Sequence, residues 1–393
     1  MAEVEEINIG IVGHIDHGKT TLLQQLSGKW ASQHSEELKR GISIKLGYAD
    51  ATIYEDSKGF NIEKKGKAVR KVSFVDAPGH EMLMATMLSG AAMIDAAILV
   101  VAANEGIKPQ TREHLMALQA KGIKELIVVQ NKIDLVDKKE AEKNYKDIQE
   151  CLSNGYGKSK IIPVSAQQGV NVESVLEAIV EFKIPARDLK GEPRFVVARS
   201  FDINKPGTLP ANLKGAVLGG TLKQGVLKTG DIIEIKPGLI KKEANQTRYE
   251  TVKTKITGLF KGSDEVKEIE PGGSVGIETE LDMVLGKNDV LAGNVVSTEG
   301  KLPDLTESVK LKFELFPEVY GLGTAVKVDP VKASETLMLS VCTSTTGGNV
   351  KKIKGDELEM SLKVPAVVFK GDNVGIARNV GGHWRLIGYG EVL

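Results

Sequence analysis

The sequence predicts an α/β domain with a parallel-rich sheet and helices on both of its faces, followed by two all-β barrels. Three observations support this fold class. Strand-like and helix-like segments alternate through the first half, helical periodicity ends after about residue 184, and a second break falls at residues 300–303. Such alternation is typical of a covered parallel sheet, whereas short β-rich runs between turn residues are typical of barrels. We expect domains at residues 1–190, 191–300 and 301–393.

The first half supplies the elements of the α/β domain. Apolar runs of strand length are separated by segments with helical spacing, in which Leu and Met recur on one side. The expected strands lie at residues 7–12, 72–75, 96–102, 126–130 and 161–164, and the expected helices at residues 19–27, 81–92, 111–121, 139–152 and 172–182. Beyond the linker at residues 184–193, the expected strands include residues 194–200, 215–222, 231–236 and 253–260.

Composition narrows the class of protein. The chain has 393 residues, with 52 basic and 52 acidic side chains, so net charge gives no indication of a nucleic-acid partner and excludes none. No apolar run approaches the roughly 20 residues that cross a bilayer, and the acidic first residues do not resemble a signal peptide. The two cysteines, Cys151 and Cys342, lie far apart. We expect a reduced, cytoplasmic protein.

A glycine-rich loop follows the first expected strand. Residues 13–20 (GHIDHGKT) have the spacing of a phosphate-binding loop, and the expected helix starts directly after it. Backbone N–H groups and the helix N-terminus favour a bound phosphate. Lys19 is expected to reach the β- and γ-phosphates and Thr20 to bind Mg²⁺. The other residues of this loop that are expected to contact the nucleotide are His17, Gly18 and Thr21.

A second motif, DAPGH at residues 76–80, closes the next strand. Its carboxylate, Asp76, can hold a water bound to Mg²⁺. Gly79 permits close approach of its N–H to a γ-phosphate, because glycine has no side chain. In isolation the motif is also compatible with a simple β-turn.

The most discriminating motif is NKID at residues 131–134. A carboxylate at Asp134 can accept from both N1–H and the exocyclic amine of guanine, whereas adenine would leave it unpaired, a mismatch that can discriminate about 10⁴-fold. Asn131 and Lys132 support this loop. Residues Ser165, Ala166 and Gln167 end a later strand and are expected to touch the guanine oxygen. The order of the motifs indicates a guanine-nucleotide site at the carboxyl edge of the sheet.

These motifs, with RGISI at residues 40–44 and PQTREH at residues 109–114, resemble those of the translational GTPases, the family that contains elongation factor Tu. Longer stretches resemble one branch of it, the gamma subunits of archaeal and eukaryotic translation initiation factor 2. These stretches are HSEELKRGISIKLGYAD (34–50), MLMATMLSGAAMIDAAILVVAANE (82–105), REHLMAL (112–118), ARSFDINKPGT (198–208) and GHWRLIGYG (382–390).

The resemblance implies a GTP switch. Its GTP form would carry initiator methionyl-tRNA to the small ribosomal subunit, within a heterotrimer whose alpha subunit binds the second domain and whose beta subunit binds the first. By resemblance, His80 orients the attacking water, and Ile15 and Ile42 form a hydrophobic gate beside it. Asp16 lies near the metal and shares the catalytic assignment with His80. The implied cofactors are GTP or GDP and Mg²⁺, with Thr20, Ser43, Asp76 and Asp16 at the metal.

Two features depart from the family. Ser43 stands where a threonine usually contacts Mg²⁺, which keeps the hydroxyl. Residues 52–70 contain no Cys or His where many members have a zinc knuckle, so we expect no zinc there and a β-hairpin or a mobile loop instead.

Transfer RNA requires aromatic and basic groups, because a ring can stack on the terminal adenine. Tyr48 matches a family position in the tRNA site, and Arg199, Arg378 and Arg385 are further candidates, although ordinary surface arginines explain them equally well. Two alternatives share the first domain's motifs: a selenocysteine-specific or Tu-like elongation factor, and the GTPase subunit of a sulfate-activating complex.

Overall fold

The computed structural model describes residues 4–29, 47–76, 88, 91–153, 155–243, 246–262, 264–322 and 324–393. The chain forms two compact units. One comprises residues 1–185, 315–329 and 379–387, and the other comprises residues 186–314, 330–378 and 388–393.

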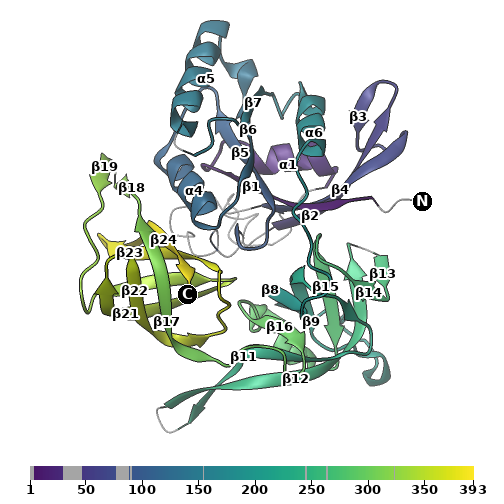
Figure 1. The fold of residues 1–393 in the computed structure, drawn as a ribbon. Helices are drawn as coiled ribbons and strands as arrows, with labels where there is room; N and C mark the ends of the chain where they lie inside the picture. Colours follow the sequence, from purple (N-terminus) through teal and green to yellow (C-terminus); the bar gives the residue numbers. More distant parts are fainter. Residues whose placement is uncertain are drawn as a thin grey trace. The chain divides into compact units, whose positions relative to one another are not determined.

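The first unit is built on a seven-stranded mixed sheet in the order β3-β2-β4-β1-β5-β6-β7 (Figure 1). Strands β1, β4, β5, β6 and β7 run parallel, and β2 and β3 form an antiparallel edge. The strands are β1 (Glu6–Gly13), β2 (Gly47–Asp56), β3 (Gly59–Asn61), β4 (Lys67–Asp76), β5 (Ala96–Ala102), β6 (Glu125–Asn131) and β7 (Lys160–Pro163).

Helices cover both faces of this sheet, as the sequence predicts: α1 and α6 lie on one face, and α4 and α5 on the other (Figure 1). They are α1 (Lys19–Ser27), α4 (Pro109–Ala120), α5 (Lys138–Leu152) and α6 (Val172–Val180). Helix α4 starts two residues before its expected start, because a proline is tolerated in the first turn of a helix, where no N–H partner is needed. The helix expected at residues 81–92 falls largely outside the described residues.

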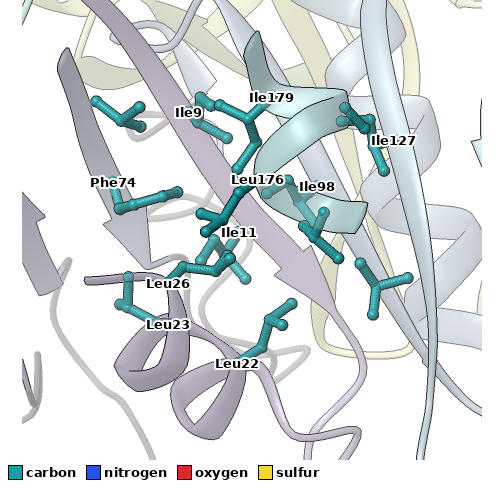
Figure 2. Close-up of a cluster of buried hydrophobic side chains, with 14 of the residues drawn as sticks. Ile9, Ile11, Leu22, Leu23, Leu26, Phe74, Ile98, Ile127, Leu176 and Ile179 are labelled. Atoms are coloured by element: carbon teal, nitrogen blue, oxygen red, sulfur yellow. The ribbon is translucent and has the colours of Figure 1, made fainter. Parts of the chain in front are cut away.

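The core of this unit lies between the sheet and helices α1 and α6. Leu22, Leu23 and Leu26 recur at helical spacing and pack with Leu176 and Ile179 against the sheet (Figure 2). All three leucines are fully buried. This packing fixes helix α1, and therefore the loop before it, against the end of β1.

The second half is all β, as expected. One closed sheet has the order β11-β16-β8-β9-β15-β12, in which β11 also pairs with β12, and β13 extends it. Its strands are β8 (Arg194–Phe201), β9 (Val217–Gln224), β11 (Ile232–Glu243), β12 (Gln246–Lys261), β13 (Asp264–Val266), β15 (Val275–Thr279) and β16 (Val295–Thr298). Strands β10 (Leu227–Lys228) and β14 (Glu268–Ile269) pair with each other, and short 3-10 turns span η3 (Pro210–Asn212) and η4 (Met283–Asp289).

The last barrel is closed by six strands in the order β17-β22-β21-β20-β23-β24. They are β17 (Thr306–Leu315), β20 (Thr336–Val341), β21 (Ser344–Lys354), β22 (Glu357–Ala366), β23 (Asn373–Val380) and β24 (His383–Val392), and a hairpin of β18 (Glu318–Leu322) and β19 (Thr324–Lys327) is inserted between β17 and β20. No helix in the described part of the chain is long and apolar enough to span a membrane.

Candidate functional site

The candidate site gathers at one edge of the seven-stranded sheet. Strand β1 ends at Gly13, β4 at Asp76 and β6 at Asn131. Gly13 pairs with Val100 of β5, so the strand ends are aligned in register. Parallel strands place their carboxyl ends on one edge, which is where such sheets bind ligands. The structure thus brings together residues 13–20, Asp76, residues 131–134 and residues 165–167. Ile42, Ser43, Gly79 and His80 lie outside the described residues.

Two glycines give the first loop its shape. Gly13 has φ +139°, and a Cβ atom there would lie 2.4 Å from the Val100 carbonyl oxygen. Gly18 has φ +89°, and a Cβ atom there would lie 2.3 Å from Asn131 Nδ2. Both positions therefore require glycine. Asp16 has φ 60°, a left-handed conformation that a short polar side chain tolerates, and its carboxylate is exposed.

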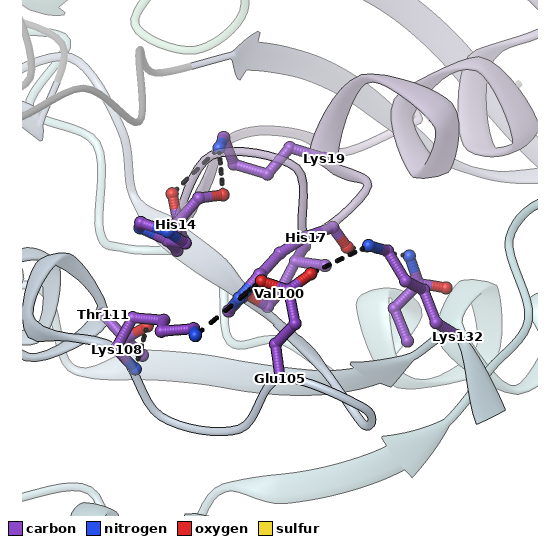
Figure 3. A network of polar contacts seen from close by, with 10 residues as sticks. His14, His17, Lys19, Val100, Glu105, Lys108, Thr111 and Lys132 are labelled. Carbon is purple, nitrogen blue, oxygen red and sulfur yellow. Dashed lines mark hydrogen bonds and ion pairs between the residues drawn. The ribbon is translucent and has the colours of Figure 1, made fainter. Parts of the chain in front are cut away.

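The ammonium group of Lys19 crosses the loop. Lys19 Nζ donates to the carbonyl oxygens of Gly13, at 2.9 Å, and His14, at 2.7 Å (Figure 3). Desolvation lowers the pKa of Lys19 to about 8, although Asp76 and Asp16 oppose the shift. The lysine is thus a buried cation whose partners are dipoles rather than a full negative charge, and a phosphate would stabilise its charged form.

Thr20 and Asp76 provide oxygen ligands at one point. Thr20 Oγ1 donates to Asp76 Oδ2 at 3.3 Å, and Asp76 is almost fully buried. A hydroxyl and a carboxylate are hard oxygen donors of the kind that Mg²⁺ binds through one or two side chains. The donor set present therefore fits a magnesium ion. Among the described residues, no group of three or more His, Cys, Asp or Glu side chains is arranged to hold a metal ion.

Asn131 joins two of the loops. Its Nδ2 donates to the His17 carbonyl oxygen at 2.9 Å, and its Oδ1 accepts from the Ala166 N–H at 2.9 Å. The side chain is buried, so both bonds are protected from water. The amide therefore fixes the spacing between the glycine-rich loop and the Ser165–Gln167 loop. Ser165 and Ala166 are buried, and Gln167 is exposed.

The Lys132 backbone has φ 62° and precedes the 3-10 turn Ile133–Leu135. Its Nζ lies 3.1 Å from Glu105 Oε1. Asp134, within the turn, is exposed at the same edge of the sheet. Its carboxylate is therefore open to solvent at that edge, and its role in guanine selection stays a prediction.

Two histidines within the loop, His14 and His17, and a third on helix α4, His114, make contacts that were not predicted from the sequence. Gly13 N–H donates to His114 Nδ1 at 2.8 Å, and His17 Nδ1 lies 3.3 Å from the Val100 carbonyl oxygen. The rings of His14 and His17 meet edge to face with centroids 5.0 Å apart (Figure 3). Burial lowers the pKa of His17 to about 4 and that of His114 to about 3, so both are neutral near pH 7. For His114, the signal in the sequence is the PQTREH motif at residues 109–114, which carries no spacing that predicts a partner in the loop.

The tRNA candidates have different environments. The Tyr48 hydroxyl lies 3.9 Å from Met93 Sδ and is partly exposed. Arg199 pairs with Asp289 at 2.9 Å, and Arg378 pairs with Glu335. Arg385 does not have the surface position expected of it: its side chain is 2 % exposed, and its Nη1 lies 2.9 Å from Glu113 Oε1. In this conformation the guanidinium group of Arg385 is engaged in a buried ion pair with the Glu113 carboxylate.

Residues 52–70 form a β-hairpin, one of the two expected forms. Strand β3 pairs with β2, and β2 pairs with β4. Phe60 and Ile62 pack against the apolar core, so hydrophobic contacts stabilise the hairpin.

Comparison with known proteins agrees with these motifs. Residues 4–185 match the family model described as the elongation factor Tu GTP binding domain, and residues 307–392 match the one described as initiation factor eIF2 gamma, C terminal. A curated protein of Methanothermobacter thermautotrophicus named translation initiation factor 2 subunit gamma is 50% identical over 408 residues, covering 100% of both chains. The protein of that name in Methanococcus vannielii is 49% identical over 403 residues, covering 99% of this chain and 98% of its own.

Among solved structures, a bacterial selenocysteine-specific elongation factor is similar with a TM-score of 0.78 and 24% identity. The match covers 99% of this chain and 58% of the other. At that identity the likeness concerns the fold alone.

Proposed function

This chain belongs to the translational GTPases, in the family of gamma subunits of translation initiation factor 2, and from that premise we propose that it carries initiator methionyl-tRNA to the small ribosomal subunit. GTP binding favours the tRNA-bound form, and hydrolysis to GDP releases the tRNA. The observation that carries the nucleotide part of this proposal is the double hydrogen bond of Asn131, at 2.9 Å to each neighbouring loop.

In the proposed nucleotide site, backbone N–H groups bind the phosphates, whereas side chains neutralise their charge and select the base. The loop from Gly13 to Thr20 holds the phosphates through its N–H groups, and Lys19 neutralises their charge. Asp134 selects guanine by accepting two hydrogen bonds from its edge. The remaining proposed contacts are Asp16, His17, Gly18, Thr21, Gly79, Asn131, Lys132, Ser165, Ala166 and Gln167.

We place Mg²⁺ at Thr20 and Asp76, whose oxygens lie 3.3 Å apart, with Ser43 and Asp16 as further contacts. The ion, when bound, neutralises charge on the β- and γ-phosphates. Hydrolysis is assigned to His80, which orients the attacking water, with Asp16 assisting at the metal. Ile15 and Ile42 form a hydrophobic gate beside that water.

The proposed partners follow from the family. The alpha subunit binds the second domain and the beta subunit binds the first, and the complex works in the cytoplasm. Tyr48 stacks on the terminal adenine of the tRNA, and Arg199 and Arg378 contact its backbone. Arg385 could join them only if its ion pair with Glu113 opened.

A carrier of elongator or selenocysteine tRNA is the second candidate, because such factors share the motifs of the first domain. Identity of 49% over the full chain favours the initiation factor. No observation favours the third hypothesis, a role as the GTPase subunit of a sulfate-activating complex.

The test is a binding competition. Methionyl initiator tRNA is titrated into the protein with GTP and then with GDP, with and without an alpha subunit, against methionyl elongator tRNA. We expect initiator tRNA to bind at least about tenfold more tightly with GTP than with GDP, a difference of about 1.4 kcal/mol. Equal affinity for both tRNAs would contradict the initiation role, and loss of GTP binding itself would contradict the nucleotide site.

A further inference from the structure

The motifs leave one carboxylate at the site without a role. Glu105 lies in the turn that follows β5, where its N–H donates to the Ala102 carbonyl oxygen at 3.2 Å. Its Oε1 is 3.1 Å from Lys132 Nζ, and its Oε2 is 3.8 Å from His17 Nε2 (Figure 3). Lys108 Nζ approaches Oε2 at 3.9 Å from the other side. One carboxylate therefore spans the glycine-rich loop and the Asn131–Asp134 loop.

Lys132 has particular need of such a partner. Its backbone adopts φ 62°, which directs the chain into the turn that carries Asp134. A lysine side chain has about 2 kcal/mol of rotamer entropy, so an unpaired Lys132 would sample many positions. The ion pair with Glu105 selects one of them, with the side chain only 25% exposed. The aliphatic chain and the ammonium group of Lys132 therefore already have a defined orientation in the protein without nucleotide.

Glu105 is suited to positioning rather than to stabilising the fold. Burial opposes its ionisation, but the hydrogen bond from Lys132 and the positive charges of Lys132 and Lys108 prevail and lower the pKa of Glu105. It is therefore ionised near pH 7. Its side chain is 29% exposed, and ion pairs open to solvent contribute little to folding.

We propose that Glu105 is a positioning residue for the bound guanine nucleotide: it holds the Lys132 side chain in one orientation beside the turn that carries Asp134, and it thereby sets the residence time of GTP and GDP. This inference rests on the nucleotide site of the proposed function and adds to it a residue that has no expected contact with the nucleotide. Variants of one binding site differ mainly in their dissociation rates, so we expect the loss of Glu105 to act mainly on dissociation.

The experiment measures association and dissociation rates of fluorescent GDP and GTP for the full chain, with Mg²⁺. The variants are Glu105→Ala, Lys132→Ala and the double variant. Glu105→Ala is expected to release nucleotide about five- to tenfold faster, because an ordered rotamer-rich side chain must then be immobilised on binding. Association should change less than about threefold. The double variant should release nucleotide no faster than about twice the rate of Lys132→Ala, since both changes remove one interaction.

Glu181→Ala is the matched control. Glu181 also pairs with a lysine, Lys160, but at residues outside the site motifs. Its rates should equal those of the wild type. Glu105→Gln, which keeps the size and an acceptor for Lys132, carries the test if Glu105→Ala fails to fold, and it should fall between wild type and Lys132→Ala.

Dissociation of both Glu105 variants within twofold of wild type would overturn the inference, as would strictly additive effects in the double variant. These outcomes leave the proposed function intact. A wild-type protein that binds neither GTP nor GDP would instead remove the proposed function itself.

Discussion

The backbone N–H of Gly13 donates to Nδ1 of His114 at 2.8 Å, so a side chain from helix α4 satisfies the first residue of the phosphate-binding loop. Both residues are buried. The adjacent residue on α4, Glu113, pairs with Arg385 of strand β24 at 2.9 Å. Two consecutive side chains of one helix therefore contact the nucleotide loop and the C-terminal strand.

His114→Ala should weaken both the fold and nucleotide binding. It leaves the buried Gly13 N–H without its acceptor, which costs about 1–3 kcal/mol. Urea unfolding should report this loss, and GDP affinity should fall about tenfold as the loop relaxes. His114→Asn places an amide oxygen near the position of Nδ1 and should recover most of both. His383→Ala, at an exposed histidine, serves as control. Unaltered GDP affinity in His114→Ala would show that this bond does not shape the loop.

As the pH falls, the protein should lose stability at a higher pH than protonation of its carboxylates alone would cause. The pKa of His17 is lowered to about 4 and that of His114 to about 3, whereas both titrate near 6.5 when unfolded. The folded state therefore binds fewer protons, so stability is full above about pH 6.5 and falls as pH drops toward 4. Between pH 7.5 and pH 5 each histidine contributes about 2 kcal/mol of this loss. Urea unfolding at the two pH values measures it. His114→Asn should lessen the slope, and an unchanged slope would argue against a neutral His114.

Asn131→Ala should abolish tight nucleotide binding while leaving the protein folded. It removes the donor to the His17 carbonyl and the acceptor for the Ala166 N–H, each a buried bond of 2.9 Å. About 1–3 kcal/mol is lost for each stranded group. GTP affinity, measured by titration calorimetry, should fall at least about a hundredfold. Asn61→Ala is a suitable control, because Asn61 also makes several local hydrogen bonds, in the exposed hairpin. A fall of less than tenfold in Asn131→Ala would show that the two loops keep their spacing without the amide.

Much of this site could be predicted from the sequence, because its motifs follow apolar runs whose length and order define a parallel sheet. The positions of Gly13, Asp76 and Asn131 at strand ends are examples. The contacts of His114 and Arg385 could not be predicted, since their partners lie 101 and 272 positions away and no local pattern encodes such pairs. The antiparallel pairing of strand β2 with β4 was not predicted. The hairpin expected from the sequence began only at residue 52, in the second half of that strand.

Asp134→Asn should change the preferred base. The side chain lies exposed in the Ile133–Leu135 turn, at the edge shared with the glycine-rich loop. An amide can accept from N1–H but also donates, which suits the C2 carbonyl of xanthine and not the amine of guanine. Competition binding should show preference for XTP over GTP by at least about tenfold, while wild type prefers GTP. Retained guanine preference would remove Asp134 from base selection.

Nucleotide affinity should fall at alkaline pH through Lys19. Its pKa is about 8 in the protein without ligand, because burial disfavours the charge and the carboxylates of Asp76 and Asp16 only partly offset this effect. A bound triphosphate favours the ammonium form and raises that pKa, so binding above pH 8 takes up a proton. Affinity is therefore full below about pH 8 and decreases as pH rises through the free-state value, by up to about tenfold per pH unit. Calorimetry at pH 8.5 in two buffers of different ionisation enthalpy should detect the proton uptake. Lys19→Arg, which stays charged at every accessible pH, should show no uptake even where it binds less tightly. Equal uptake in wild type and Lys19→Arg would assign the proton to another group.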